Sequence, residues 1–173
     1  SASPIYNKFM NIAKSLKPNY ISMIMPTKWY AGGKGLNTFR DEMLNDIHIS
    51  ELHDFLEPGL IFKNINLRGG ICYLLWEKEY DNWKNLTTMH TYKDSLSPTS
   101  YSRCLKTEGS DILIRHSIAV KMIKKINSKS KFESFEKHIS SRKPFGIEGN
   151  VDEDEKIFRS SKKKMKNPII CYA

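Results

Sequence analysis

Residues 20–25, Tyr-Ile-Ser-Met-Ile-Met, form a short and mostly apolar run that ends at Pro26. Six residues is a common length for a strand, and apolar side chains on both of its faces are typical of a strand buried in a parallel sheet. Proline cannot donate a hydrogen bond to a neighbouring strand, so the strand should end there. The run therefore predicts a central strand, buried on both faces, in an α/β sheet.

Elements of alternating type surround this strand. Apolar residues recur at helical spacing in residues 6–16 and again in residues 37–44, which predicts a helix on either side of the strand. Residues 49–56 and 71–76 have the composition of two further strands. A chain that alternates helices with buried strands is typical of the α/β class.

The second part of the sequence has a different pattern. We expect a strand, a loop or linker, two helices and a last strand, at residues 86–92, 95–102, 111–127, 132–139 and 169–172. Residues 1–102 contain 11 basic and 10 acidic residues, whereas residues 103–173 contain 17 and 9. We therefore predict a boundary near residues 93–105, between an α/β part (1–95) and a smaller, basic α+β part (103–173).

Several classes of protein do not fit the composition. No apolar run approaches the ~20 residues of a membrane helix, and the first ten residues do not resemble a signal peptide. The three cysteines are widely spaced, which argues against a disulfide framework or a Cys-x-x-Cys zinc site. These features predict a cytoplasmic bacterial protein that does not bind membranes.

The histidines suggest no metal site. His48 and His53 are close to Glu51 and Asp54, but together these residues straddle the start of a strand and lack metal-site spacing. His90 is isolated in the sequence, as are the remaining two histidines. We therefore predict no metal ligands and no catalytic residues in this chain.

Lys28, Trp29, Tyr30 and Lys34 follow the strand that ends at Pro26. Ligands of open α/β sheets bind beyond the carboxyl ends of the strands. The two aromatic rings could stack on a base there, and the two lysines could contact phosphates. The alternative is that the rings only cover the edge of the sheet. These four residues are candidate DNA contacts.

Five blocks of sequence are distinctive as an ordered set. They are Ser-Pro-Ile-Tyr-Asn-Lys-Phe (3–9), Ile-Ser-Met-Ile-Met-Pro-Thr-Lys-Trp-Tyr-Ala-Gly-Gly-Lys-Gly-Leu (21–36), Phe-Arg-Asp-Glu-Met-Leu-Asn-Asp (39–46), Arg-Gly-Gly-Ile-Cys-Tyr-Leu-Leu-Trp (68–76) and Ser-Ser-Arg-Lys-Pro-Phe-Gly (140–146). Together they resemble the N6-adenine DNA methyltransferases of type II, including IIG-like, restriction–modification systems.

This resemblance implies the C-terminal half of a doubly wound, Rossmann-like methyltransferase sheet that leads into a target-recognition region. Residues 20–25, 49–56 and 71–76 would be its fifth, sixth and seventh strands. The family's donor loop and Asn-Pro-Pro-Tyr motif do not occur in this sequence. S-adenosylmethionine is therefore expected as cofactor of the complete enzyme and not of this chain alone, and the missing half is expected on the same or a separate polypeptide.

The resemblance also suggests residues that contact DNA. An aromatic residue at the end of the seventh strand packs on the flipped adenine in the family, and Trp76 has the matching position; a role in the core is the alternative. Further candidate contacts to double-stranded DNA are Arg142, Lys143, Lys162, Lys163 and Lys164.

Two other functions stay open at this stage. The basic second part also fits a non-catalytic DNA-binding or specificity module, although a composition rich in Lys, Asn and Ile raises the charge without any ligand. A metal-dependent restriction nuclease is favoured less, because Asp154-Glu155-Lys156 matches only half of such a motif.

Overall fold

The structure is a computed structural model that describes residues 4–32, 35–64, 67–80, 84–94, 96–129, 133 and 135–139. The chain divides into two compact units, residues 1–130 and 131–173. In the second unit the described residues include one short 3₁₀ helix, η3 (Phe135–His138). All other elements described below belong to the first unit.

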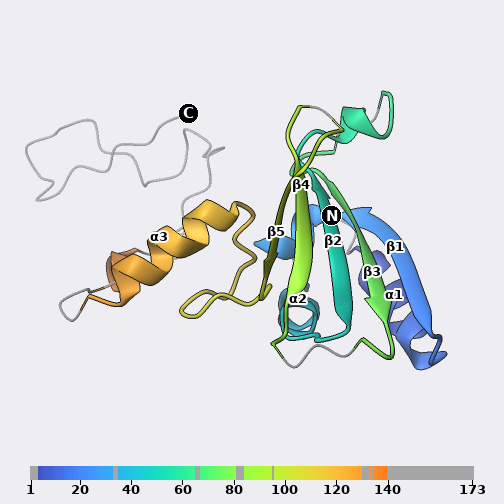
Figure 1. The fold of residues 1–173 in the computed structure, drawn as a ribbon, viewed down its shortest axis with the longest axis horizontal. Helices are drawn as coiled ribbons and strands as arrows, with labels where there is room; N and C mark the ends of the chain where they lie inside the picture. The colour runs from blue at the N-terminus through green and yellow to red at the C-terminus, as the bar shows by residue number, and fades with distance from the viewer. Residues whose placement is uncertain are drawn as a thin grey trace, which may run out of the picture. The chain divides into compact units, whose positions relative to one another are not determined.

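A single mixed sheet of five strands forms the centre of the first unit (Figure 1). The order across the sheet is β1-β3-β2-β4-β5. Its strands are β1 (Tyr20–Pro26), β2 (Ile49–Phe55), β3 (Ile71–Glu77), β4 (Thr87–Tyr92) and β5 (Thr99–Arg103). β3 runs antiparallel to both β1 and β2, whereas β4 is parallel to β2 and antiparallel to β5. The chain is therefore of mixed α/β class.

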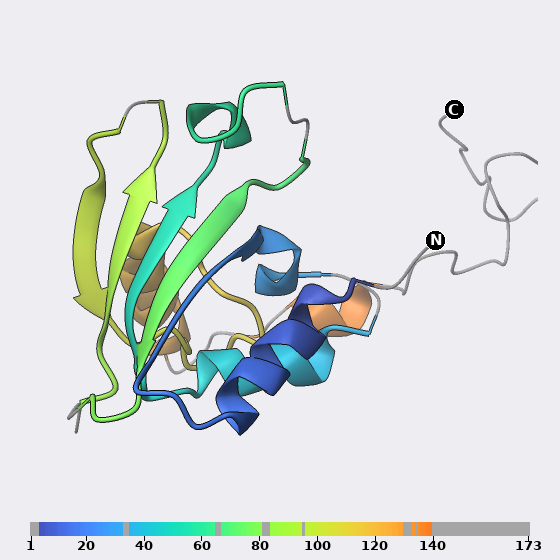
Figure 2. The same ribbon diagram turned by 90° about the vertical axis from the view of Figure 1, so that its right-hand side faces the viewer.

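Helices α1 (Tyr6–Ser15) and α2 (Asn37–Leu44) cover one face of this sheet, as Figure 2 shows. Met10 of α1 and Met43 of α2 are fully buried there, together with Trp29 of the 3₁₀ helix η1 (Thr27–Tyr30). Leu52 and Leu74 point into the same core from β2 and β3. Because side chains alternate along a strand, the residues between these core positions lie on the opposite face. A second 3₁₀ helix, η2 (Pro58–Leu60), follows β2.

Most of the predicted elements are confirmed. The helices expected at residues 6–16 and 37–44 correspond to α1 and α2, and the strands expected at 49–56, 71–76 and 86–92 correspond to β2, β3 and β4. These segments have the clearest apolar periodicity, so their type could be predicted from local pattern. Among the described helices, none combines the length and the apolar character that crossing a membrane requires.

The predicted position of residues 20–25 in the sheet is wrong. These residues form β1, but β1 lies at the edge of the sheet and not at its centre. β3 is the only strand that pairs with β1 among the described residues. Tyr20 is 66% exposed and Ile24 is 47% exposed, because they alternate with the buried Ile21 and Met25 and point to the face opposite α1 and α2. An apolar run indicates that a strand prefers burial, but it does not show which neighbours are present to bury it.

The later part of the chain also differs from the prediction. Residues 95–102, expected to form a loop or linker, include most of β5, whose polar sequence Thr-Ser-Tyr-Ser-Arg conceals a strand. The helix expected at 111–127 is the shorter α3 (Ser117–Asn127), and the one expected at 132–139 is replaced by η3 over part of its length. The boundary expected near 93–105 falls inside one compact unit, because β4 and β5 pair across it.

Candidate functional site

Thr27 connects the carboxyl end of β1 to the turn that precedes β3. Its hydroxyl donates a hydrogen bond to the Gly69 carbonyl at 2.5 Å, and its backbone N–H donates to the Gly70 carbonyl at 3.2 Å. Gly70 has a φ of +97°, and a Cβ atom there would lie 2.3 Å from the carbonyl oxygen of Phe55. Only glycine fits this close approach. The Gly69-Gly70 turn therefore joins the carboxyl ends of β1 and β2.

A buried ion pair between Asp54 and Arg115 lies at the same carboxyl ends of the strands. Asp54 is fully buried at the end of β2, and its two carboxylate oxygens accept hydrogen bonds of 2.8 Å and 2.6 Å from the Arg115 guanidinium. A third guanidinium N–H donates to the Gly69 carbonyl at 2.6 Å. Burial by itself lowers the pKa of Arg115, but the hydrogen bonds and the charge of Asp54 outweigh burial and raise it. The pair ties the segment before α3 to the sheet.

Trp29 and Tyr30 are core residues in this structure. Their rings make an edge-to-face contact with a centroid distance of 4.7 Å, and Trp29 makes a second such contact with Phe39 at 6.0 Å. Burial, followed by the neighbouring Cys72, raises the pKa of the Tyr30 hydroxyl well above its usual value. The Arg115 guanidinium lies 5.5 Å from the centre of the Tyr30 ring. Both rings are thus buried in this structure, with 0% and 3% exposure, as the alternative of covering the sheet edge implies, and their contact with DNA stays a prediction.

The predicted basic contacts are only partly described. Lys28 is exposed between the buried Thr27 and Trp29, so its side chain is available to a phosphate. Lys34 and the C-terminal candidates lie outside the described residues; the latter are Arg142, Lys143, Lys162, Lys163 and Lys164.

Trp76 lies near the beginnings of β1 and β2, at the end of the sheet opposite Thr27. Because β3 is antiparallel to its neighbours, Trp76 pairs with Ile21 and Ile49 at the beginnings of β1 and β2, while Ile71 pairs with their carboxyl ends. Five residues of strand, or ~17 Å, separate the two ends of β3 at this spacing. The Trp76 side chain is also buried, with 8% exposure. This placement does not fit the expected stacking on a flipped base and favours the core role.

Trp76 belongs instead to a polar network around Asp46. The indole N–H of Trp76 donates to the Asp46 carboxylate at 3.1 Å, and Lys14 of α1 forms an ion pair with the same carboxylate at 2.5 Å. The His48 ring lies 3.1 Å from Asp46 and packs against Trp76 with a centroid distance of 5.1 Å. Burial raises the pKa of Asp46, but the hydrogen bonds from Lys14 and His48 outweigh it and lower the pKa. Asp46 thus joins α1 to the end of the sheet at which β1 and β2 begin.

Sequence reasoning missed the ion pair of Asp54 with Arg115. Asp54 lies two residues after the apolar Leu52 and thus on the same face of β2, where an acidic residue needs a partner, so its position was a usable signal. The partner was not recognisable, because 61 residues separate the two and Arg115 lies in a segment that was expected to be helical.

The chain is similar to known proteins in part of its length. Residues 1–62 match the family described as Eco57I restriction-modification methylase. An uncharacterized adenine-specific methylase of Mycoplasma pneumoniae is 29% identical over 93 residues, which are 53% of this chain and 22% of that protein. A solved structure, the methyltransferase subunit of a type I restriction-modification system from Streptococcus thermophilus, is similar over 61% of this chain and 19% of its own, with 13% identity and a TM-score of 0.33.

The family match and the curated relative confirm the predicted resemblance to adenine methyltransferases of restriction–modification systems. The chain spans only 22% of the length of that curated relative.

Proposed function

We propose that this chain is the C-terminal part of the catalytic domain of a site-specific adenine-N6 DNA methyltransferase in a restriction–modification system. A second segment, on the same or a separate polypeptide, would supply the donor loop and the Asn-Pro-Pro-Tyr motif. The complete enzyme would act on double-stranded DNA and use S-adenosylmethionine. The segment that matches the methylase family, residues 1–62, contains α1, β1, α2 and β2.

The open edge of β1 is the observation that carries this proposal. No strand pairs with the outer side of β1 in the part of the chain that the structure describes, and residues 20–25 contain no charge that would prevent another strand from pairing there. Soluble proteins protect long edge strands with lysine, proline or bulges, because an unprotected edge invites pairing. In β1 the only lysine or proline is Pro26, at the end of the strand. The edge therefore suits a further strand from the missing segment.

Helix α1 extends the same surface. Its buried side carries Met10, with Tyr6 and Ala13 partly buried beside it. A second stripe remains exposed along and just before the helix, formed by Ile5, Phe9, Ile12 and Leu16. The exposed stripe lies next to the buried one, and a helix whose apolar surface extends beyond its core face is typical of a helix that a further layer also contacts. We infer that the missing segment covers this outer stripe and pairs with β1.

The described residues do not themselves form a cradle for the methyl donor. At the carboxyl ends of β1 and β2 the space is filled by the rings of Trp29 and Tyr30 and by the pair of Asp54 with Arg115. Donor binding is therefore assigned to the missing segment. The contribution of this chain is to hold that segment in place and, through Lys28, to contact a DNA phosphate.

Reconstitution tests the proposal. The full chain is mixed with a polypeptide that contains the donor loop and Asn-Pro-Pro-Tyr motif encoded next to it, and methyl transfer from tritiated S-adenosylmethionine to adenine in duplex DNA is measured. We expect transfer only with the mixture. Assembly without any adenine methylation, while the mixture still binds DNA with strong salt dependence, would instead support the specificity module.

A matched pair of variants tests the interface. Phe9→Asp places a charge in the exposed stripe of α1, where the native ring is 56% exposed, and should weaken assembly at least about tenfold, as expected for an anchor in an apolar interface. Leu96→Asp makes the same change at a more exposed position between β4 and β5 and should leave assembly unchanged. Equal assembly of both variants with the partner would contradict the assigned surface.

A further inference from the structure

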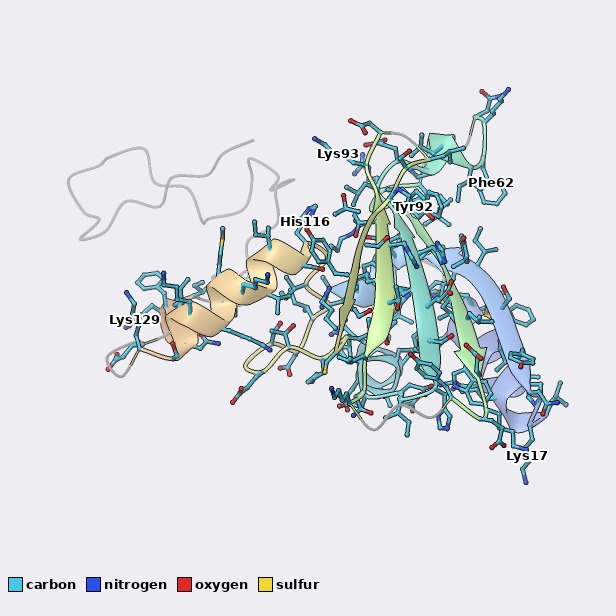
Figure 3. The ribbon with its side chains drawn as sticks, viewed as in Figure 1. Lys17, Phe62, Tyr92, Lys93, His116 and Lys129 are labelled. Carbon is cyan, nitrogen blue, oxygen red and sulfur yellow. The ribbon has the colours of Figure 1, made fainter. Side chains whose placement is uncertain are left out.

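The face of the sheet opposite α1 and α2 carries a ladder of stacked rings. The His53 ring lies between Tyr73 of β3 and His90 of β4, with centroid distances of 4.1 Å and 4.3 Å. Phe55 and Tyr92 stack in the same way nearer the carboxyl end of β2, at 4.1 Å. Figure 3 shows Tyr92 near the end of β4, on the broad face of the sheet turned toward the viewer. The faces of these rings stack against one another, so they are not free to stack on the bases of a nucleic acid.

Glu51, His53 and His90 bring three metal-ligating side chains together on this face. Glu51 and His53 are two residues apart on β2 and therefore point to the same side. His90 is the direct neighbour of His53 in the parallel pairing of β2 with β4. One potential ligand atom from each residue lies within 4.8 Å of the other two, and all three side chains are half-buried.

Hydroxyl groups orient both imidazole rings. The Nδ1 atom of His53 lies 2.9 Å from the Tyr92 hydroxyl, and the Nδ1 atom of His90 lies 2.7 Å from the Ser100 hydroxyl on β5. A histidine that binds a metal through one nitrogen usually has its other nitrogen fixed in this way. The Nε2 atom of His53 is turned toward Glu51, whose Oε2 lies 3.0 Å away. The three side chains thus supply potential metal ligands, and the Tyr92 and Ser100 hydroxyls orient the two histidines among them.

We propose that Glu51, His53 and His90 form a binding site for a divalent transition-metal ion of the zinc class. Two imidazole nitrogens and one carboxylate oxygen are the ligands such ions prefer, and they leave a fourth position for water. Calcium and magnesium fit less well, because they favour sites made of oxygen ligands only.

Coordination requires a small local rearrangement. Ligand atoms around one zinc ion are each about 2.0–2.2 Å from it, so atoms that lie up to 4.8 Å apart must move closer together. The His90 ring would have to rotate out of its stack with His53, which would also change its contact with the Ser100 hydroxyl.

Titration of the full, untagged chain with Co²⁺ tests this site. We expect saturable visible absorption from one tightly coordinated Co²⁺ per chain, its displacement by one equivalent of Zn²⁺, and a higher thermal midpoint with either ion. His90→Gln and Glu51→Gln should each abolish the absorption. Tyr92→Phe removes the hydroxyl beside His53 and should weaken Co²⁺ binding by about tenfold. Circular dichroism of each variant establishes that it is folded.

His116→Gln is the matched control, since His116 lies at the start of α3 and does not belong to the cluster of Glu51, His53 and His90. It should bind Co²⁺ like the wild-type chain. The proposal is overturned if the wild-type chain shows no saturable spectrum, if folded His90→Gln retains it, or if His116→Gln loses it equally. Adenine methylation is not a readout here, so failure of the metal site leaves the methyltransferase proposal intact.

Discussion

Replacement of Arg115 by methionine should destabilise the first unit through the charge that it leaves behind. Arg115→Met keeps the apolar stem but removes two hydrogen bonds to the fully buried Asp54 and one to Gly69. Loss of one partner of a buried ion pair typically costs ~3–5 kcal/mol, because the remaining charge has no compensation. The Arg115 side chain is 24% exposed, so water can reach part of the site. We therefore expect the lower end, about 3 kcal/mol.

Urea unfolding followed by circular dichroism measures this loss. With a denaturant slope of about 2 kcal/mol per molar, the midpoint should fall by about 1.5 M. The double variant Asp54→Leu/Arg115→Met removes both charges and should recover at least half of the lost stability, because no buried charge is left unpaired. A change below about 0.5 kcal/mol for Arg115→Met, or strictly additive effects in the double variant, would refute this reasoning.

Three further predictions address other parts of the chain. Residues 1–173 alone should show no S-adenosylmethionine binding by calorimetry, and low-micromolar binding would contradict the proposed division of the enzyme. Gly70→Ala should cost about 3 kcal/mol of unfolding free energy, from its positive φ and the clash with the Phe55 carbonyl, whereas Gly59→Ala, with open space around it, should stay within about 1 kcal/mol of wild type in the same urea assay. Trp76→Ala should destabilise by about 3–5 kcal/mol, and Trp76→Phe should recover most of this; an unchanged midpoint for the alanine variant would exclude the core role.

Local pattern was sufficient to predict most elements of the sheet and its helices. β2 and β3 combine apolar residues with strand-like alternation, and α1 repeats its apolar residues at helical spacing. β5 could not be recognised in this way, because it lies at the far edge of the sheet and four of its five residues are exposed and mostly polar. Pattern detects a strand by the core that it faces, so an edge strand without a core face escapes detection.

The candidate site was harder to predict, because it depends on strand direction and on contacts between distant residues. The resemblance predicts that Trp76 ends a strand, and it does lie near the end of β3. Because β3 is antiparallel to β1 and β2, however, that end lies beside the beginnings of β1 and β2 and not beside their carboxyl ends. The same limit applies to Glu51, His53 and His90. His90 is isolated in the sequence, and only the parallel pairing of β2 with β4 makes it a neighbour of His53. Spacing along the chain therefore could not reveal the cluster.

The difference between the expected and observed positions of β1 has a physical interpretation. Its sequence has the apolar character of an interior strand, yet Tyr20 and Ile24 are exposed at an unprotected edge. Exposure of this kind costs about 25 cal/mol for each Å² of apolar surface, so a sequence evolved for an edge would carry polar or charged residues there. α1 shows the same mismatch, because it has one apolar side in the core and another in solvent. The two mismatches are adjacent in the fold, since α1 packs beside β1. A strand added to β1 would pair with its outer backbone groups, and a layer over α1 would bury its exposed stripe; under the proposed function, a second segment of the methyltransferase domain supplies both.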